Sequence, residues 1–186
     1  MKKMIKLLVL TSCSYLQSYS QAGVYLSASD FNNHKLQHKI DCNTGTIKLH
    51  SFMRSNPSIS IAEGTEKQTF NAKAIYGYTD CNRKTYRFFN NKEYFIAEAG
   101  DLFIYMQKEY VAEYHKKNRV VYSWYFSTDA GSNVMELTMG NLKMVYKDNT
   151  KFLELLDLHF QSGEVTAYDN MHKMYKVNYV YEQSEK

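Results

Sequence analysis

The residues that could carry chemistry are few and scattered along the chain. His34 and His38 are four positions apart, so on a helix both rings would point the same way, as a pair of metal ligands requires. No carboxylate or cysteine cluster completes the pair, and the segment lacks apolar periodicity, which favours a solvated loop. Glu98 and Asp101 could act as an acid–base pair, but they flank a turn, where acidic residues are ordinary. We therefore predict no catalytic residue and no metal site.

The sequence motifs of the common enzyme classes are absent. The chain has no nucleophile elbow, no zinc-protease helix motif, no glycine-rich phosphate loop and no dinucleotide fingerprint. Catalytic groups can also be assembled from distant positions, so the absence of motifs is weak evidence against an enzyme. We predict no cofactor, and nothing here favours an enzyme over a binding or structural protein.

Aromatic residues are the one compositional oddity, with 17 Tyr and 10 Phe among 186 residues. Tyr suits a β-strand that places the ring on the core and the hydroxyl in water, so a structural role is the first interpretation. The alternative is a binding face, because exposed rigid rings lose little entropy when they stack on a glycan or a peptide. The candidate ligand-binding residues for that face are Tyr76, Tyr78, Tyr105 and Trp124.

The segment from Ala74 to Gln107 predicts an antiparallel meander around which the chain is organised. Turn-forming residues separate its β-rich runs, and the connections are too short for parallel crossovers. We expect Asn82 to take the positive φ of the first turn. Because side chains alternate across a strand, one set of residues in the last strand should point to the core and the other set to the opposite face, and both sets are apolar. The expected strands are Ile75–Thr79, Thr85–Phe89, Tyr94–Ala97 and Leu102–Met106, the last with Leu102, Ile104 and Met106 opposite Phe103 and Tyr105.

Strands are predicted before and after the meander, and helices follow them. The apolar period changes from 2 to 3.6 after Thr138, and strands first with helices last indicate an α+β domain. We predict a single domain over residues 23–186, with an antiparallel sheet of about seven to nine strands and two to three C-terminal helices packed on it. The other expected strands are Gly23–Leu26, Thr46–Leu49, Ser58–Ala62, Lys67–Phe70, Val120–Ser127 and Val134–Leu137. The expected helix caps are Ser27, Thr138, Asp148 or Asn149, and Thr166 with Asp169, with Gly163 ending the second C-terminal helix and Glu182 the third.

Residues 1–22 predict a secretory signal peptide. They contain a basic start, an apolar run from Leu7 to Leu10, and Ser20 and Ala22 as small residues before the cleavage point. The apolar run is far shorter than the ~20 residues that cross a bilayer, so we predict no transmembrane span. A competing interpretation is a lipoprotein, because Leu10 to Cys13 is similar to a lipobox that would make Cys13 a lipid anchor.

Removal of residues 1–22 changes the charge and leaves two cysteines. The segment contains three lysines and no acid, so the formal charge falls from +4 to +1, which gives no electrostatic case for nucleic acid. Cys42 and Cys81 either pair in an oxidising compartment or remain buried free thiols. The spacing alone does not decide between these alternatives, because it does not place two Cα atoms within bridging distance.

Five segments carry a resemblance to known proteins: GVYLSASDF (23–31), IYGYTDCNRKTYRFFNNKEY (75–94), WYFS (124–127), LTMGNLK (137–143) and YDNMHKMYKVN (168–178). In these segments the chain resembles a group of exported Gram-negative bacterial proteins of unknown function. The resemblance covers nearly the whole of residues 23–186 in order, behind the signal peptide. That group usually has Gly in the turn after Asp80, where this chain has Asn82 and Arg83, so the resemblance supports the hairpin and leaves its turn type open. It implies one exported domain, and no catalytic residue is transferred from it.

These observations favour an exported envelope protein, in the periplasm or on the cell surface, that binds another protein or a glycan through an aromatic-rich sheet or serves as a structural component. The alternative is a small hydrolase that acts on cell-envelope polymers, with a site assembled from scattered His, Asp and Glu. A concave pocket that holds His near a carboxylate would favour the hydrolase. A patch of exposed Tyr would favour the binding module.

Overall fold

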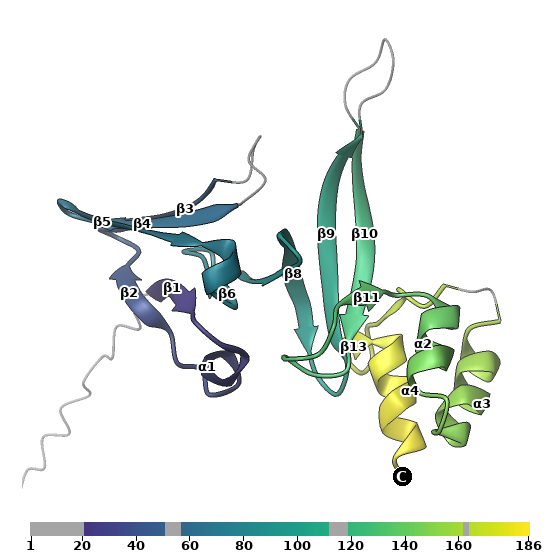
Figure 1. Cartoon of the computed structure of the whole chain (residues 1–186). Helices are drawn as coiled ribbons and strands as arrows, with labels where there is room; N and C mark the ends of the chain where they lie inside the picture. Colours follow the sequence, from purple (N-terminus) through teal and green to yellow (C-terminus); the bar gives the residue numbers. More distant parts are fainter. Residues whose placement is uncertain (1–20, 51–56, 112–118, 162–163) are drawn as a thin grey trace, which may run out of the picture.

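The main element of the fold is a strongly twisted antiparallel sheet (Figure 1). The computed structural model describes residues 21–50, 57–111, 119–161 and 164–186. Within these residues the sheet has eight strands in the order β11-β10-β9-β8-β7-β6-β1-β2, and the predicted α+β class is confirmed. Its strands are β1 (Gln21–Tyr25), β2 (Gln37–Asp41), β6 (Gly77–Thr79), β7 (Thr85–Phe89), β8 (Lys92–Ala99), β9 (Phe103–Val111), β10 (Arg119–Ser127) and β11 (Met135–Glu136).

A separate three-stranded sheet covers one end of the main sheet. It consists of β3 (Gly45–His50), β4 (Ser58–Glu63) and β5 (Glu66–Asn71), and a short 3-10 helix, η1 (Ala72–Ala74), follows it. The central strand β4 buries Ile59 and Ile61 in one cluster with Val24, Tyr78 and Phe88 of the main sheet. The predicted strands of this region therefore form their own layer, seen above β1 and β2 in Figure 1.

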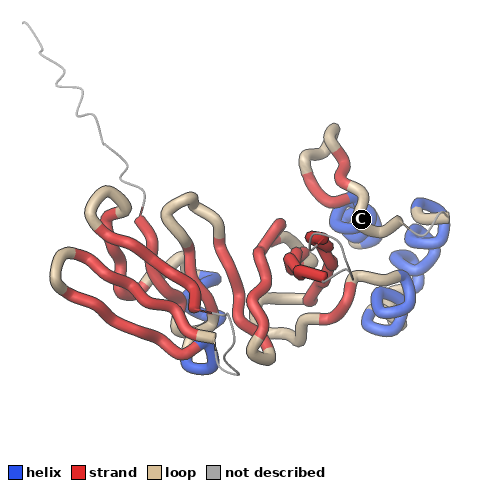
Figure 2. Tube along the Cα trace, turned by 90° about the horizontal axis from the view of Figure 1, so that it is seen from above, coloured by secondary structure: helices blue, strands red, loops and turns tan. Residues whose placement is uncertain are grey.

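Three helices cover the other end of the main sheet. They are α2 (Met139–Val145), α3 (Thr150–His159) and α4 (Lys176–Ser184), and Figure 2 shows them at the end opposite the small sheet. Leu102, Ile104 and Phe126 from the sheet are fully buried against them. The predicted caps at Thr138 and Asn149 are confirmed, because their side chains accept hydrogen bonds from the backbone N–H groups of the first turns of α2 and α3.

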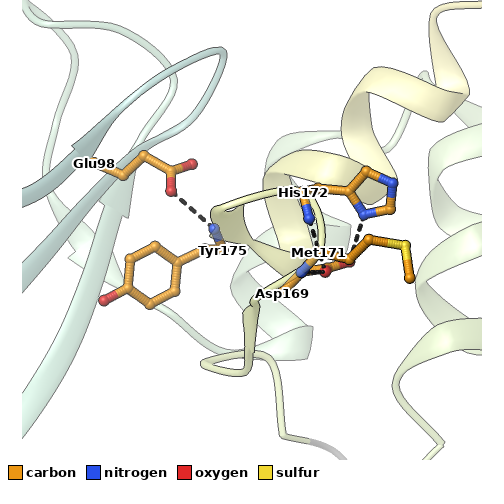
Figure 3. A network of polar contacts seen from close by, with 5 residues as sticks. All are labelled: Glu98, Asp169, Met171, His172 and Tyr175. Carbon is orange, nitrogen blue, oxygen red and sulfur yellow. Dashed lines mark hydrogen bonds and ion pairs between the residues drawn. The ribbon is translucent and has the colours of Figure 1, made fainter.

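The third C-terminal helix is present, but its predicted start at Thr166 is wrong. Tyr168–Asp169 and Met174–Tyr175 form a small hairpin, β12–β13, and α4 begins only at Lys176. The Asp169 carboxylate accepts hydrogen bonds from the backbone N–H of Met171 and His172 and bonds the His172 ring at 2.8 Å, so it stabilises the hairpin turn (Figure 3). The predicted stop at Gly163 lies outside the described residues.

Two polar side chains join this C-terminal part to the meander. Glu98 of β8 accepts a hydrogen bond from the backbone N–H of Tyr175 at 2.8 Å (Figure 3). It accepts a second from the side-chain amide of Asn178. Asn178 also bonds both the N–H and the carbonyl of Leu102, each at 2.9 Å. Both of these contacts of Glu98 are structural, since they hold β8 to β13 and to α4.

The opposite face of the sheet is covered by α1 (Ala28–Asn32) and by the loop after β10. Ser27 caps α1 through a hydrogen bond from Asp30 N–H, as predicted. The cluster on this face consists of Tyr25, Phe31, Tyr76, Tyr94, Ile96, Phe103, Tyr105 and Ala130. Tyr105 and Phe103 therefore point away from Ile104 and Leu102, as strand alternation predicted.

Arg87 is the buried charge at the centre of this second face, and it is only 3% exposed. Its guanidinium donates to the Tyr105 hydroxyl (2.8 Å), the Ser127 hydroxyl (3.3 Å) and the Ser132 carbonyl (2.7 Å). Nε has no hydrogen-bond partner within the described chain. The rings of Tyr76 and Phe89 lie 5.2 and 5.4 Å from the guanidinium carbon and offset part of the cost of burying the cation.

The structure joins Cys42 and Cys81 in a disulfide, with Cα atoms 5.4 Å apart. The bridge connects the end of β2 to the turn between β6 and β7. In that turn Arg83, with φ of 62°, occupies the left-handed region that the sequence assigned to Asn82. Asp80 fixes the turn by accepting hydrogen bonds from Asn82 and Lys84 N–H.

The start of the first strand bears on the predicted cleavage site. β1 begins at Gln21, and Ala22 is fully buried and paired with Ile40. Two residues assigned to the signal peptide thus belong to the folded sheet, and residues 1–20 lie outside the described part. No helix among the described residues is long and apolar enough to cross a bilayer.

We predict that Arg87→Lys lowers the free energy of unfolding by about 1–3 kcal/mol, because an ammonium group cannot reproduce the guanidinium fork that holds groups on three separate segments. Urea unfolding measures the effect. Arg83→Lys, at an exposed turn position, is the matched control with the same change of side chain and is expected to stay within about 0.5 kcal/mol of the parent. Equal stability of the two variants would show that the hydrogen bonds of the Arg87 guanidinium add nothing to stability that an ammonium group does not supply.

Candidate functional site

The sheet splits between β8 and β9. These strands pair only from Phe95 and Met106 to Ala99 and Phe103. Beyond Phe95 and Met106, β8 remains paired with β7, whereas β9 continues with β10 as a two-stranded ribbon that leaves the body of the molecule (Figure 1). Among the described strand pairs, none joins the outer parts of β8 and β9.

A cleft of about 540 Å³ lies at this split. Its volume falls within the range of small-ligand sites, roughly 300–1,000 Å³. Its walls come from the main sheet, from the turns before and after β7, and from Leu49 of the small sheet. The residues of the main sheet and of these turns that line it are Lys84, Tyr86, Asn91, Lys92, Glu93, Phe95, Met106, Gln107, Lys108 and Tyr122.

The position of the cleft follows from one row of paired residues that crosses the sheet from β1 to β10. Directly paired residues share a face, so the whole row lies on one side of the sheet. The small sheet covers the β1 end of the row and the helices pack at the β10 end. Between these ends, Tyr86, Phe95 and Met106 are half-buried and form the floor of the cleft. In order the row is Val24, Tyr78, Tyr86, Phe95, Met106 and Trp124.

The side chains of the floor are held in position by neighbours on the same face of the sheet. Tyr86 stacks on Tyr78 with ring centroids 4.9 Å apart and an interplanar angle of 14°. The buried Tyr78 hydroxyl donates a 2.5 Å hydrogen bond to Glu93, and Lys84 lies 6.0 Å above the Phe95 ring. The rings available to a ligand are therefore already fixed in position, which reduces the entropy lost on binding.

Burial changes the ionisation of the groups at this wall. Loss of hydration raises the pKa of Glu93, the Asp80 charge raises it further, and the Tyr78 hydrogen bond opposes both. Burial also raises the pKa of Tyr78, with the Glu93 charge and hydrogen bond adding to the effect, and burial raises the pKa of Tyr86 to about 12. Both tyrosines therefore stay protonated and can act as hydrogen-bond donors at neutral pH.

The four aromatic residues predicted from the sequence do not form one exposed face. Tyr76 and Tyr105 are buried on the α1 side of the sheet, at 9% and 0% exposure. Tyr78 is 6% exposed and lies beneath the cleft, while Trp124 is half-buried and packs on Tyr175 at 5.2 Å. The expectation of exposed rings at Tyr76, Tyr78 and Tyr105 is thus wrong, because both faces of the sheet are covered where these residues lie.

Sequence reasoning did not find the residues that line the cleft. Alternation placed Tyr86 and Phe88 on one face, which is correct, but gave no reason to prefer Tyr86 over its buried neighbours. Glu93 and Phe95 of β8 line the same cleft as Tyr122 of β10 because β8 and β9 separate there. No local signal in the sequence marks that separation.

The described residues contain no group of three or more His, Cys, Asp or Glu arranged to hold a metal ion. His34 and His38 do not share a helix, since His34 follows α1 and His38 lies in β2. Comparison with protein-family models, with curated proteins and with solved structures finds no match to this chain. The function must therefore be argued from the cleft itself.

We predict that the free energy of unfolding of the Glu93→Gln variant increases relative to that of the parent as the pH rises. A folded-state pKa above the unfolded value of about 4.3 means that Glu93 stabilises the fold at low pH and that this contribution is lost as the pH rises through the folded pKa. Gln resembles the neutral acid and does not ionise, so the variant keeps this contribution at every pH. Urea unfolding of variant and parent from about pH 4 to pH 7 should show a stability difference that grows in favour of the variant.

The control for this prediction is Glu154→Gln, at an exposed position of α3. Its stability difference from the parent should stay nearly constant over the same pH range. A constant difference for Glu93→Gln as well would contradict the raised pKa.

Proposed function

We propose that this protein is a non-enzymatic binding module of the bacterial cell envelope, and that it holds a glycan or protein segment in the cleft between β8 and β9. The observation that supports the proposal is the half-exposed aromatic floor of a cleft of about 540 Å³. Ligand sites combine apolar and aromatic walls with a few polar groups that fix orientation. This cleft has Tyr86, Phe95 and Tyr122 for the first role and Asn91 and Glu93 for the second.

The alternative of a hydrolase has one observation in its favour. Glu93 has a raised pKa, as a general acid requires. Hydrolysis of a glycosidic bond ordinarily needs a second carboxyl group across the cleft, and Glu93 is the only carboxylate among the lining residues. None of the described residues that line the cleft is a His, so they include no imidazole that could activate water. The lining groups therefore suit binding better than catalysis.

Export to the envelope is the second part of the proposal. The signal-peptide pattern of the first residues supports it, and so does the Cys42–Cys81 disulfide, because such bonds persist in oxidising compartments. Cleavage after Ala22 would remove a buried residue and its pairing with Ile40. We therefore place the cleavage after Ser20, where Ser18 and Ser20 supply the small residues at −3 and −1.

We expect removal of cleft rings to weaken ligand retention. Tyr122 is 51% exposed, so Tyr122→Ala should weaken binding by about 1–2 kcal/mol without unfolding the protein, and Phe95→Ala should act in the same direction. The purified protein is screened against a glycan panel and envelope extracts, and the variants are compared on every ligand found.

Tyr168→Ala is the matched control for this screen. Tyr168 is 49% exposed and lies on the β12–β13 hairpin, outside the cleft lining. The control should keep full affinity. Retention of every ligand by Tyr122→Ala and Phe95→Ala would rule out the cleft as the binding site.

Intact-mass measurement of the protein from a fractionated native host tests the export proposal. We expect a periplasmic or surface species that begins at Gln21 and is two hydrogens lighter than the reduced chain, because the Cys42–Cys81 bond has formed. A diacylated species beginning at Cys13 would overturn this assignment, and a start at Gly23 would show that β1 tolerates the loss of its first two residues.

A further inference from the structure

We infer that the ligand of the cleft is an acidic oligosaccharide, whose sugar rings lie on Tyr86 and Phe95 and whose acid groups bind Lys84 and Lys92 at the rim. This inference rests on the proposed function and specifies the class of ligand. Three lysines, Lys84, Lys92 and Lys108, line the cleft with a single carboxylate.

The balance of charge in the cleft is positive, although the exported chain as a whole is nearly neutral. Lys84 lies over the Phe95 ring at 6.0 Å, so a cation and a stacking surface occupy the same place. Glu93 is tied to Tyr78 by a 2.5 Å hydrogen bond, so its carboxyl group is already engaged within the protein. The lysines outnumber this single carboxylate among the lining residues and decide the sign of the local field.

The floor of the cleft suits the rings of a glycan. Tyr86, Phe95 and Met106 are paired neighbours on adjacent strands, so the sheet offers a ligand the side-chain face of this row. A peptide that gains the main-chain hydrogen bonds of strand addition would instead use the unpaired outer edges of β8 and β9, which lie in the plane of the sheet and not over these rings. Sugar rings can stack on the aromatic faces while their hydroxyls bond the amides of Asn91 and Gln107.

The decisive measurement uses oligogalacturonate and its methyl ester as probes, because they share backbone and ring faces and differ only in charge. Calorimetric titration of the protein with its disulfide intact should show binding of the acid at least about tenfold tighter than that of the ester. Raising the salt concentration should weaken the binding, since charge pairs near a surface are screened.

Two sets of variants locate the binding. Lys84→Gln with Lys92→Gln should weaken oligogalacturonate binding by about tenfold, because both side chains are exposed at the rim and contribute charge there. Lys151→Gln, exposed on α3 and outside the cleft lining, makes the same kind of change and should have no effect.

The outcomes separate failure of the inference from failure of the proposed function. Equal affinity for acid and ester, tighter binding of polyglutamate than of oligogalacturonate, or no effect of the two rim substitutions would each overturn the acidic glycan. If Tyr122→Ala and Phe95→Ala still abolish binding of some other ligand, the binding function stands and only its ligand class is wrong. If these aromatic variants retain every ligand, the proposed function fails as well.

Discussion

One face of the main sheet is covered by two separate layers, and the interval between them keeps the cleft open. The small sheet packs over β1 and β6, and the helices pack over β9 and β10. Strands twist relative to their neighbours, so the two ends of an eight-stranded sheet turn away from each other and one flat layer cannot cover both. The middle strands β7 and β8 are left between the two layers, with Tyr86 and Phe95 half-exposed on them.

The opposite face supplies the rigidity that this open interval needs. Arg87 lies between Tyr86 and Phe88 in β7, and its guanidinium is bonded to β9, to β10 and to the loop that follows β10. Because neighbouring side chains point to opposite faces, fixing Arg87 also fixes the position from which Tyr86 enters the cleft. Gly77 permits this arrangement, since a Cβ there would lie 2.0 Å from the Tyr86 carbonyl oxygen.

The parts of the fold that follow from local periodicity could be predicted from the sequence. Alternation located β7 and the two faces of β9, and the change of period located α2 and α3 with their caps. Asp169 was predicted at a helix start but stabilises a hairpin turn. The same side chain can do either, and only its neighbours decide which. The assignment of ligand-binding rings failed for a different reason. Whether Tyr76 or Tyr86 is exposed depends on layers that come from distant segments, and sequence pattern does not place those layers.

The abundance of Tyr has a structural explanation that also accounts for the two unusual charges in the sheet. A buried Tyr requires a partner for its hydroxyl, and Tyr78 finds Glu93 while Tyr105 finds Arg87 and Ser127. Glu93 and Arg87 are therefore first of all hydrogen-bond partners of buried Tyr hydroxyls. Arg87 lies on β7 and Glu93 on β8, at the middle of the sheet. Aromatic content by itself does not mark a binding face. The rings that the two covering layers leave half-exposed lie beside the lysines of the cleft rim, and it is there that we propose binding.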